Sequence, residues 1–241
     1  MNPLHGLFLV LIGMGAGFIQ RVSGFGLGIF AMMFLPHFLP SHTAAATISC
    51  LFSSVTSTYN AILYRKSVAY KMVLPMLLTA LITIPVAVHF SAAVSGDVFK
   101  ILLGGALVVL SLYFLFFNKR IRMRPTVPNG LIAGSVSGIL SGLFSTGGPP
   151  AVLYLSCATE NNITYFATIQ FFFCVTNLYA TAVRIVNGIV TSDILLSSAI
   201  GIVGCMIGDY LGKAVFDKLD SDKLKYIIYI GMTISGIIMF F

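Results

Sequence analysis

The sequence is poor in charge: only 9% of its 241 residues are Asp, Glu, Lys or Arg, whereas 58% are hydrophobic. Ordinary soluble domains contain about 25% charged residues, and so few cannot cover a solvated surface. Tryptophan is absent, so tyrosine must supply any aromatic belt at a membrane surface. These deficits exclude a water-soluble fold and predict an all-α polytopic membrane protein.

The chain also lacks the motifs of catalysis. It has four histidines, four cysteines and seven acidic residues, with no HExxH, no CxxC and no phosphate-binding loop. Its net charge is +7, but the basic residues lie in short loops, where they act as topology signals rather than nucleic-acid contacts. We therefore predict a protein that is not an enzyme and that needs no cofactor, metal or nucleic acid. An integral membrane enzyme is the weakest alternative.

Apolar runs interrupted by polar residues define the expected membrane segments. A spanning helix needs about 20 residues, which leaves room for about eight to ten segments. A basic stretch at 118–129 is predicted to be a cytoplasmic connector between a first repeat, 1–117, and a second repeat, 130–241. The segments are expected at 4–20, 29–39, 43–63, 72–90, 98–117, 130–144, 151–158, 163–184, 193–211 and 224–241.

The two halves repeat one pattern at a constant offset, which indicates an internal duplication. The matches, each 121 positions apart, are Gly17 with Gly138, Gly26 with Gly147, and Thr47 with Thr168. Chance matching of small residues in apolar sequence is the alternative.

Charge predicts how the repeats are oriented. The loop around 64–71 is basic and its counterpart at 185–192 is not, whereas 91–97 has no basic residue and 213–225 has four lysines. Because basic short loops mark the cytoplasmic side, equivalent loops lie on opposite faces, as in inverted repeats. A parallel arrangement of four plus four segments is the alternative, and it would place 213–225 outside.

Segment lengths predict a re-entrant hairpin in the second half. Residues 130–143 and 151–158 form helices of about 21 and 12 Å, too short for a hydrocarbon core of about 30 Å. In the first half, 4–20 is nearly long enough to span, so a hairpin and two short spans both remain open. Each repeat is thus expected to combine a broken or re-entrant glycine-rich segment with three transmembrane helices.

Two aligned breaks, Ser-Gly-Phe-Gly-Leu-Gly at 23–28 and Ser-Thr-Gly-Gly-Pro-Pro at 145–150, are the candidate site. Backbone that leaves a helix inside a bilayer needs partners, and helix N-termini bind anions. Breaks that enter from opposite faces would hold an anion between them. The alternative is that glycines only permit close helix packing, which we expect for residues 104–105 and for Gly134, Gly138 and Gly142.

Polar side chains near the breaks complete the candidate site. Arg21 fits either neutralisation of an anion or a turn at the cytoplasmic face, and Arg184 is predicted to reach the interface. Asp209 is predicted to pair with Lys213 on the same helix face, with proton coupling through Asp209 as the alternative. The candidate substrate-binding residues are Gln20, Arg21, Ser23, Gly24, Gly26, Thr47, Ser145, Thr146, Gly147, Gly148, Thr168, Gln170 and Asn177.

The glycine pattern at 24–28, the Ala-Thr pair at 46–47 and the segment 138–150 resemble the TauE/SafE sulfite exporter family, transporters of the sulfonate uptake permease type. The resemblance covers essentially the whole chain and implies transport of a sulfur-containing anion, such as sulfite or a sulfonate, across the inner membrane. Phe25, Leu27 and Arg21 depart from the family's more glycine-rich tendency, and substrate identity varies within it.

We therefore predict a multi-pass secondary transporter of the cell inner membrane, and an exporter, that moves a small sulfur-containing anion by alternating access around a midplane site. Its partners are the anion and the lipid bilayer, and the sequence carries no signal for the oligomeric state. A transporter of another small anion, such as a carboxylate, or of a neutral metabolite is the alternative. The scarcity of intramembrane Asp and Glu disfavours a cation.

Overall fold

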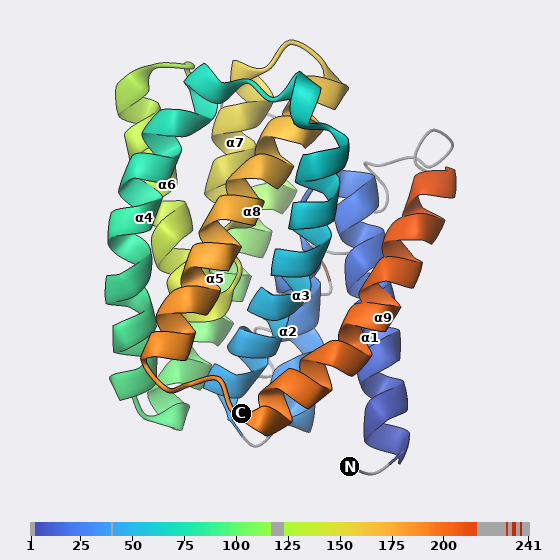
Figure 1. Ribbon diagram of the computed structural model, residues 1–241. Helices are drawn as coiled ribbons and strands as arrows, with labels where there is room; N and C mark the ends of the chain where they lie inside the picture. Colours follow the sequence, from blue (N-terminus) through green and yellow to red (C-terminus); the bar gives the residue numbers. More distant parts are fainter. Residues whose placement is uncertain are drawn as a thin grey trace.

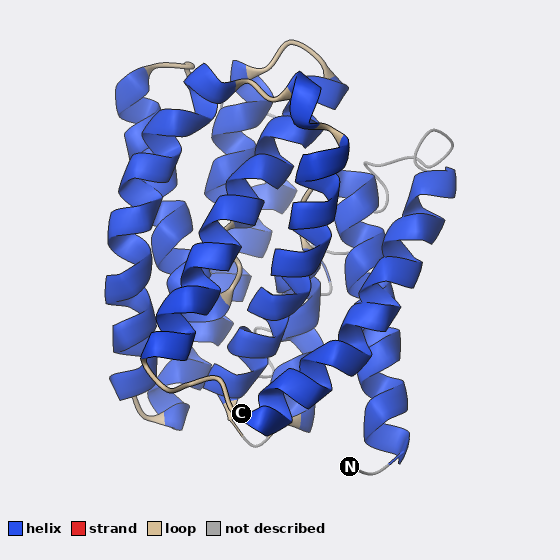
Figure 2. Ribbon diagram, in the orientation of Figure 1, coloured by secondary structure: helices blue, strands red, loops and turns tan. Residues whose placement is uncertain are grey.

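The computed structural model describes residues 3–39, 41–116 and 123–215, together with 230, 233, 234 and 237. Within these residues the chain consists of helices and their connections (Figure 2). The expected span at 224–241 and the start of the connector at 118–129 fall largely outside them. The elements are α1 (Pro3–Ser23), α2 (Leu27–Phe38), α3 (His42–Leu63), the 3-10 turn η1 (Arg65–Ser67), α4 (Tyr70–Ala93), α5 (Gly96–Phe116), α6 (Val127–Phe144), α7 (Gly148–Ala158), α8 (Asn162–Val186) and α9 (Ser192–Val215).

Among the described residues, six helices are long and apolar enough to cross a membrane. The outer surface is apolar, since Ile82 and Val86 on α4 are each 70% exposed, whereas Gln170, Thr56 and Asn60 are fully buried. Apolar side chains outside and hydrogen-bonded polar side chains inside suit a lipid environment. The prediction of an all-α polytopic membrane protein is confirmed.

Apart from the α1–α2 and α6–α7 breaks, the connections gather at two opposite ends of the bundle (Figure 1). At one end, which we call the basic end, Arg65 and Lys66 of η1 lie near the start of α8, where the Ala69 N–H donates to Thr168 Oγ1 at 2.9 Å. At the far end, the α2–α3, α4–α5 and α8–α9 connections meet. There the Thr43 hydroxyl donates to the carbonyl oxygen of Ser91 at 3.4 Å. The membrane-crossing helices run between these two ends.

The first break reverses the chain. Phe38, the last residue of α2, stacks on Phe8 of α1 with ring centres 4.9 Å apart, so α2 returns toward the end from which α1 starts. The α2 helix has 12 residues, a length of about 18 Å. The α1–α2 pair is therefore a helical hairpin that belongs to the far end.

The second break makes a similar hairpin from the basic end. A Cβ on Gly130, near the start of α6, would lie 3.1 Å from the Tyr154 hydroxyl of α7 and 3.3 Å from Pro75 of α4. The α7 helix therefore runs back along α6. The α6 helix has 18 residues and begins at Val127, earlier than expected, because Pro128 occupies its first turn, where a missing N–H does no harm. The expectation that this segment is too short to cross is therefore wrong, since α6 is one of the six helices of sufficient length.

Small residues bring neighbouring helices into backbone contact. A Cβ on Gly134, Gly138 or Gly142 of α6 would overlap or crowd atoms of α4, which agrees with the predicted packing role. Gly105 does not fit that prediction, because no described atom lies within 4 Å of its added Cβ. The α1 helix lies on α9 in a comparable way, with Gly17 against the Cys205 carbonyl oxygen and Gly208 against that of Met14. Such approaches let van der Waals contacts hold helices together in lipid.

Candidate functional site

The tips of the two hairpins touch inside the bundle. A Cβ on Gly28, in the first turn of α2, would overlap the carbonyl oxygen of Ser145 in the second break. A Cβ on Gly148, at the start of α7, would lie 3.4 Å from Phe25 in the first break. Since one hairpin comes from each end, both breaks lie at the same depth in the molecule. Glycine is required at position 28 because any side chain would push the breaks apart.

The first break uses glycine for its backbone conformation. Gly24 and Gly26 have φ angles of +80° and +97°, a region that glycine enters without steric cost. Gln170 Nε2 of α8 donates to the Gly24 carbonyl oxygen at 2.8 Å, which satisfies a backbone group freed by the break. Gly26 is the N-cap of α2 and offers no side chain to the first N–H groups of that helix. Those N–H groups lack partners within the helix and carry its positive dipole end.

The second break turns at Ser145, the C-cap of α6, which has a φ angle of +59°. The N–H groups of Ser145 and Thr146 donate back to α6, to the carbonyl oxygens of Ser141 at 3.0 Å and Leu140 at 3.3 Å. Pro149 and Pro150 then open α7 without needing acceptors. The backbone N–H groups of the turn are thus hydrogen-bonded to α6. The Ser145 and Thr146 side chains of the turn face the interior.

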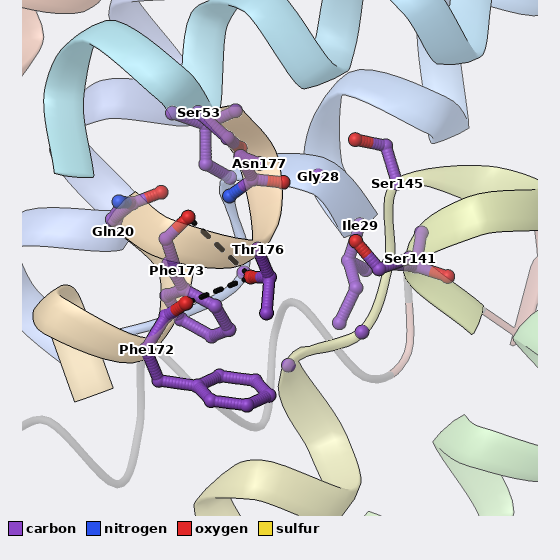
Figure 3. A pocket seen from close by; sticks show the side chains of 15 residues that line it. Gln20, Gly28, Ile29, Ser53, Ser141, Ser145, Phe172, Phe173, Thr176 and Asn177 are labelled. Carbon is purple, nitrogen blue, oxygen red and sulfur yellow. Dashed lines mark hydrogen bonds between the residues drawn. The ribbon is translucent and has the colours of Figure 1, made fainter. Parts of the chain in front are cut away.

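A small cavity of about 20 Å³ lies where the breaks meet (Figure 3). This volume is enough for about one water molecule, so an anion of several atoms needs a rearrangement of the walls. The hydroxyl oxygens of Ser145 and Thr146 are buried here and have no hydrogen-bond partner in the described part of the chain. The lining residues are Gln20, Gly26, Leu27, Gly28, Ile29, Ser53, Ser141, Ser145, Thr146, Gly147, Gly148, Phe172, Phe173, Thr176 and Asn177.

An amide pair joins α1 to α8 beside the cavity. Gln20 Nε2 donates to Gln170 Oε1 at 3.0 Å, and both side chains are buried. Because Gln170 also donates to the first break, this pair links the cavity wall to the broken backbone. Asn177, two turns further along α8, lines the cavity itself.

Arg21 belongs to a buried network toward the basic end. Its Nη1 donates to Asn60 Oδ1, and its Nη2 donates to the Tyr64 hydroxyl at 2.6 Å. Asn60 Nδ2 in turn donates to Asp209 Oδ1 at 2.8 Å, and Arg21 Nη1 lies 4.0 Å from Asp209 Oδ2. The guanidinium carbon also lies 5.1 Å from the centre of the Phe166 ring. The charge on Arg21 is therefore balanced by a carboxylate and aromatic faces.

The predicted site residues divide into three groups by their place in the structure. Ser23, Gly24 and Gln170 shape the first break behind the wall, with the Ser23 hydroxyl 2.6 Å from the Phe25 carbonyl oxygen. Arg21, Thr47 and Thr168 lie away from the cavity, and each threonine hydroxyl donates to the carbonyl four residues earlier. The residues that line the cavity are Gln20, Gly26, Ser145, Thr146, Gly147, Gly148 and Asn177.

Several lining residues were not predicted from the sequence. Ser53 comes from the hydroxyl-rich α3, and Ser141 comes from the last turn of α6. Both lie one helical turn from another buried serine, Ser49 and Ser137 respectively. This spacing was a usable signal, since one face of each helix carries several hydroxyls within an apolar segment.

Two predictions about charged residues are wrong. Arg184 does not reach the interface: it is fully buried and its Nη2 donates to the Gly142 carbonyl oxygen at 2.8 Å. Asp209 forms its hydrogen bond and its ion pair across the bundle, with Asn60 and Arg21, rather than with Lys213 on its own helix. Both errors arise because the partners are distant in sequence.

Comparison with known proteins identifies the family. The family model described as sulfite exporter TauE/SafE matches residues 9–239. No curated protein and no solved structure matches the chain. The family match spans both hairpins and the cavity between them. The chain therefore belongs to the TauE/SafE sulfite exporter family of membrane transporters.

Proposed function

We propose that this protein is a secondary transporter of a small sulfur-containing anion, sulfite or an organosulfonate, which binds between the two helix breaks. The observation that carries the proposal is the cavity at their meeting point, lined by the Ser145 and Thr146 hydroxyls, which have no hydrogen-bond partner among the described residues. Both hydroxyls can donate to oxygens of a bound anion. The first turn of α2, with Gly28 and Ile29 in the wall, adds backbone N–H donors.

The chemistry of the wall favours an anion over a cation. Among the described residues that line the cavity, none is acidic, and amide and hydroxyl groups supply the polar contacts. Asp209, which lies in α9, is engaged by Asn60 and Arg21. A cation would leave these donors unpaired, whereas the three oxygens of sulfite or a sulfonate would accept from them.

Alternating access between inverted repeats, 1–117 and 130–241, is the mechanism that we propose. Helix pairing supports it, because α1 packs on α9 while its sequence counterpart α6 packs on α4, and α3 packs on α8. The small cavity supports it too, since the substrate must enter through a rearrangement. Transporters of this design rock one repeat against the other around a fixed midplane site.

We further propose that the basic end faces the cytoplasm of the cell's inner membrane and that the protein exports its substrate. The described basic-end residues Arg65, Lys66 and Lys71 follow the positive-inside rule. The family description names sulfite export, and coupling to protons through Asp209 is the corresponding proposal for the driving force.

The test is flux into proteoliposomes that contain the purified protein, with protein-free liposomes as the control. Radiolabelled sulfite, taurine, acetate and an uncharged sugar are supplied in turn under imposed proton and voltage gradients. We expect protein-dependent flux of sulfite or the sulfonate and little flux of the sugar. Preferred flux of acetate or the sugar would establish another substrate class instead, and absence of flux for every solute would refute transport.

A further inference from the structure

Arg184 is a buried cation that has no acidic partner among the residues that the structure describes. It lies in α8 with no exposed surface, and only its Nη2 is paired, with the Gly142 carbonyl oxygen. Its Nε and Nη1 have no hydrogen-bond partner in the part of the chain that the structure describes. Burying an unpaired charge is costly, and ionisable residues within membrane segments mark substrate pathways. Since no carboxylate of the described residues pairs with this charge, the position suits a bound anion.

Arg184 continues a polar row along α8. Gln170, Asn177 and Arg184 follow one another at seven-residue intervals, so they share one face of the helix and are spaced about 10 Å apart. All three are buried. Gln170 holds the first break and Asn177 lines the cavity, so the row leads from the hairpin tips toward the far end.

The Arg184 guanidinium also contacts the chain next to a residue of the cavity wall. The carbonyl group to which it donates belongs to Gly142, the neighbour of the lining residue Ser141. An anion that leaves the cavity along α8 would therefore meet the unpaired N–H groups of Arg184 next. Arg184 is one of the last residues of α8 before the far-end connection to α9.

Arg21, on the basic side of the cavity, differs from Arg184 in how its charge is balanced. Arg21 is paired with Asp209, Asn60 and Tyr64, so its charge and donors are largely used. Among the described residues, Arg184 has no acidic partner, and its Nε and Nη1 have no acceptor. The interior is thus more attractive to an anion on the far side of the cavity than on the basic side.

We propose that Arg184 forms a second anion-binding station between the central cavity and the far end, where a small oxyanion pauses during transport. The station rests on the proposed function, since it binds the same substrate. The anion's oxygens would accept hydrogen bonds from Nε and Nη1, while Nη2 stays anchored to Gly142.

The experiment measures initial sulfite uptake into proteoliposomes over a range of sulfite concentrations. It compares the wild type with Arg184→Gln, Arg184→Lys and the matched control Arg65→Gln, which removes an exposed arginine of η1. We expect Arg184→Gln to raise the KM for sulfite by about tenfold or more, as for loss of hydrogen bonds to a charged group. Arg184→Lys should give an intermediate KM because it keeps the charge but not the planar fork, and Arg65→Gln should leave KM unchanged.

The outcomes separate the station from the proposed function. A wild-type protein that moves no anion would refute transport itself. Normal wild-type flux with an unchanged KM in folded Arg184→Gln would overturn the station and leave the function standing. Equal KM values in the Gln and Lys variants, with parallel losses of thermal stability, would assign Arg184 a packing role instead. If Arg184→Gln does not fold, a wild-type KM in folded Arg184→Lys would overturn the station.

Discussion

Individual buried polar residues connect the helices in the interior of this membrane protein. Gln20 and Gln170 are buried and bonded to each other, and Gln170 also bonds to the broken backbone. Buried Asn60 joins α1 to α9 through Arg21 and Asp209. Sequence reasoning selected Gln20 and Gln170 because they interrupt apolar segments. It could not assign partners to Arg184 or Asp209, because these lie on helices more than 40 residues away in the chain. Local spacing finds a polar residue, whereas only the packed structure shows its partner.

Gly28 offers a test of the contact between hairpins. We expect Gly28→Ala to lower the unfolding free energy by about 1–3 kcal/mol, as overpacking does, and to abolish sulfite flux. The reason is that the new Cβ would overlap the Ser145 carbonyl oxygen. Gly96→Ala, whose Cβ would have its nearest neighbour at 3.9 Å, is the control for both measurements. Full flux in Gly28→Ala would argue against a site at the hairpin tips.

The Arg21–Asp209 network predicts a large loss on removing one partner. Asp209→Ala leaves Arg21 as a buried cation, so we expect about 3 kcal/mol lower stability. Denaturant unfolding in detergent measures this loss, and Asp193→Asn, an exposed acidic residue at the start of α9, is the control. Adding Arg21→Met to Asp209→Ala should recover part of the stability. A double variant no more stable than Asp209→Ala would contradict the pairing.

At the scale of helices, the sequence predicts the positions of the breaks along the chain, but it does not predict how deep in the bundle they lie. Glycine and proline spacing placed both interruptions, which the structure confirms between Ser23 and Leu27 and between Phe144 and Gly148. Whether α1 spans or turns back depends on the contact between the hairpin tips, which has no local signal. The contribution of α3 to the cavity wall was missed for a similar reason. Its hydroxyl residues are scattered in the sequence, and only the folded helix shows that they share one face.

Helix pairing predicts opposite effects for alanine at two helical glycines. Gly208→Ala should destabilise the protein by about 2 kcal/mol, because its Cβ would overlap the Met14 carbonyl oxygen of α1. Gly105→Ala, with no described atom within 4 Å of the new Cβ, should stabilise it by up to about 1 kcal/mol through helix propensity. Thermal unfolding in detergent compares them. Equal shifts of the same sign would refute the close α1–α9 contact.

At the scale of the whole molecule, charge sets the expected orientation. Arg65 and Lys66 lie at the basic end, and Asp97 and Asp193 begin helices at the far end. In a cysteine-free background, Asp97→Cys should react with an impermeant thiol reagent in intact cells. Lys66→Cys should react only after the membrane is permeabilised. The reverse labelling pattern would invert the proposed topology and place the Arg184 station on the cytoplasmic side.

The whole molecule brings two breaks, whose matching glycines Gly26 and Gly147 are 121 positions apart in the sequence, to one cavity, and the central claim is that an anion binds there. The most direct test is sulfite flux by the double variant Ser145→Ala/Thr146→Val. It removes two buried hydroxyls that have no partner in the described structure, with little change in volume. Ser156→Ala, an exposed serine of α7, is the control. We predict that the double variant folds with an unchanged thermal midpoint and loses about tenfold or more of its flux at low sulfite. Wild-type flux in the folded double variant would contradict the central site.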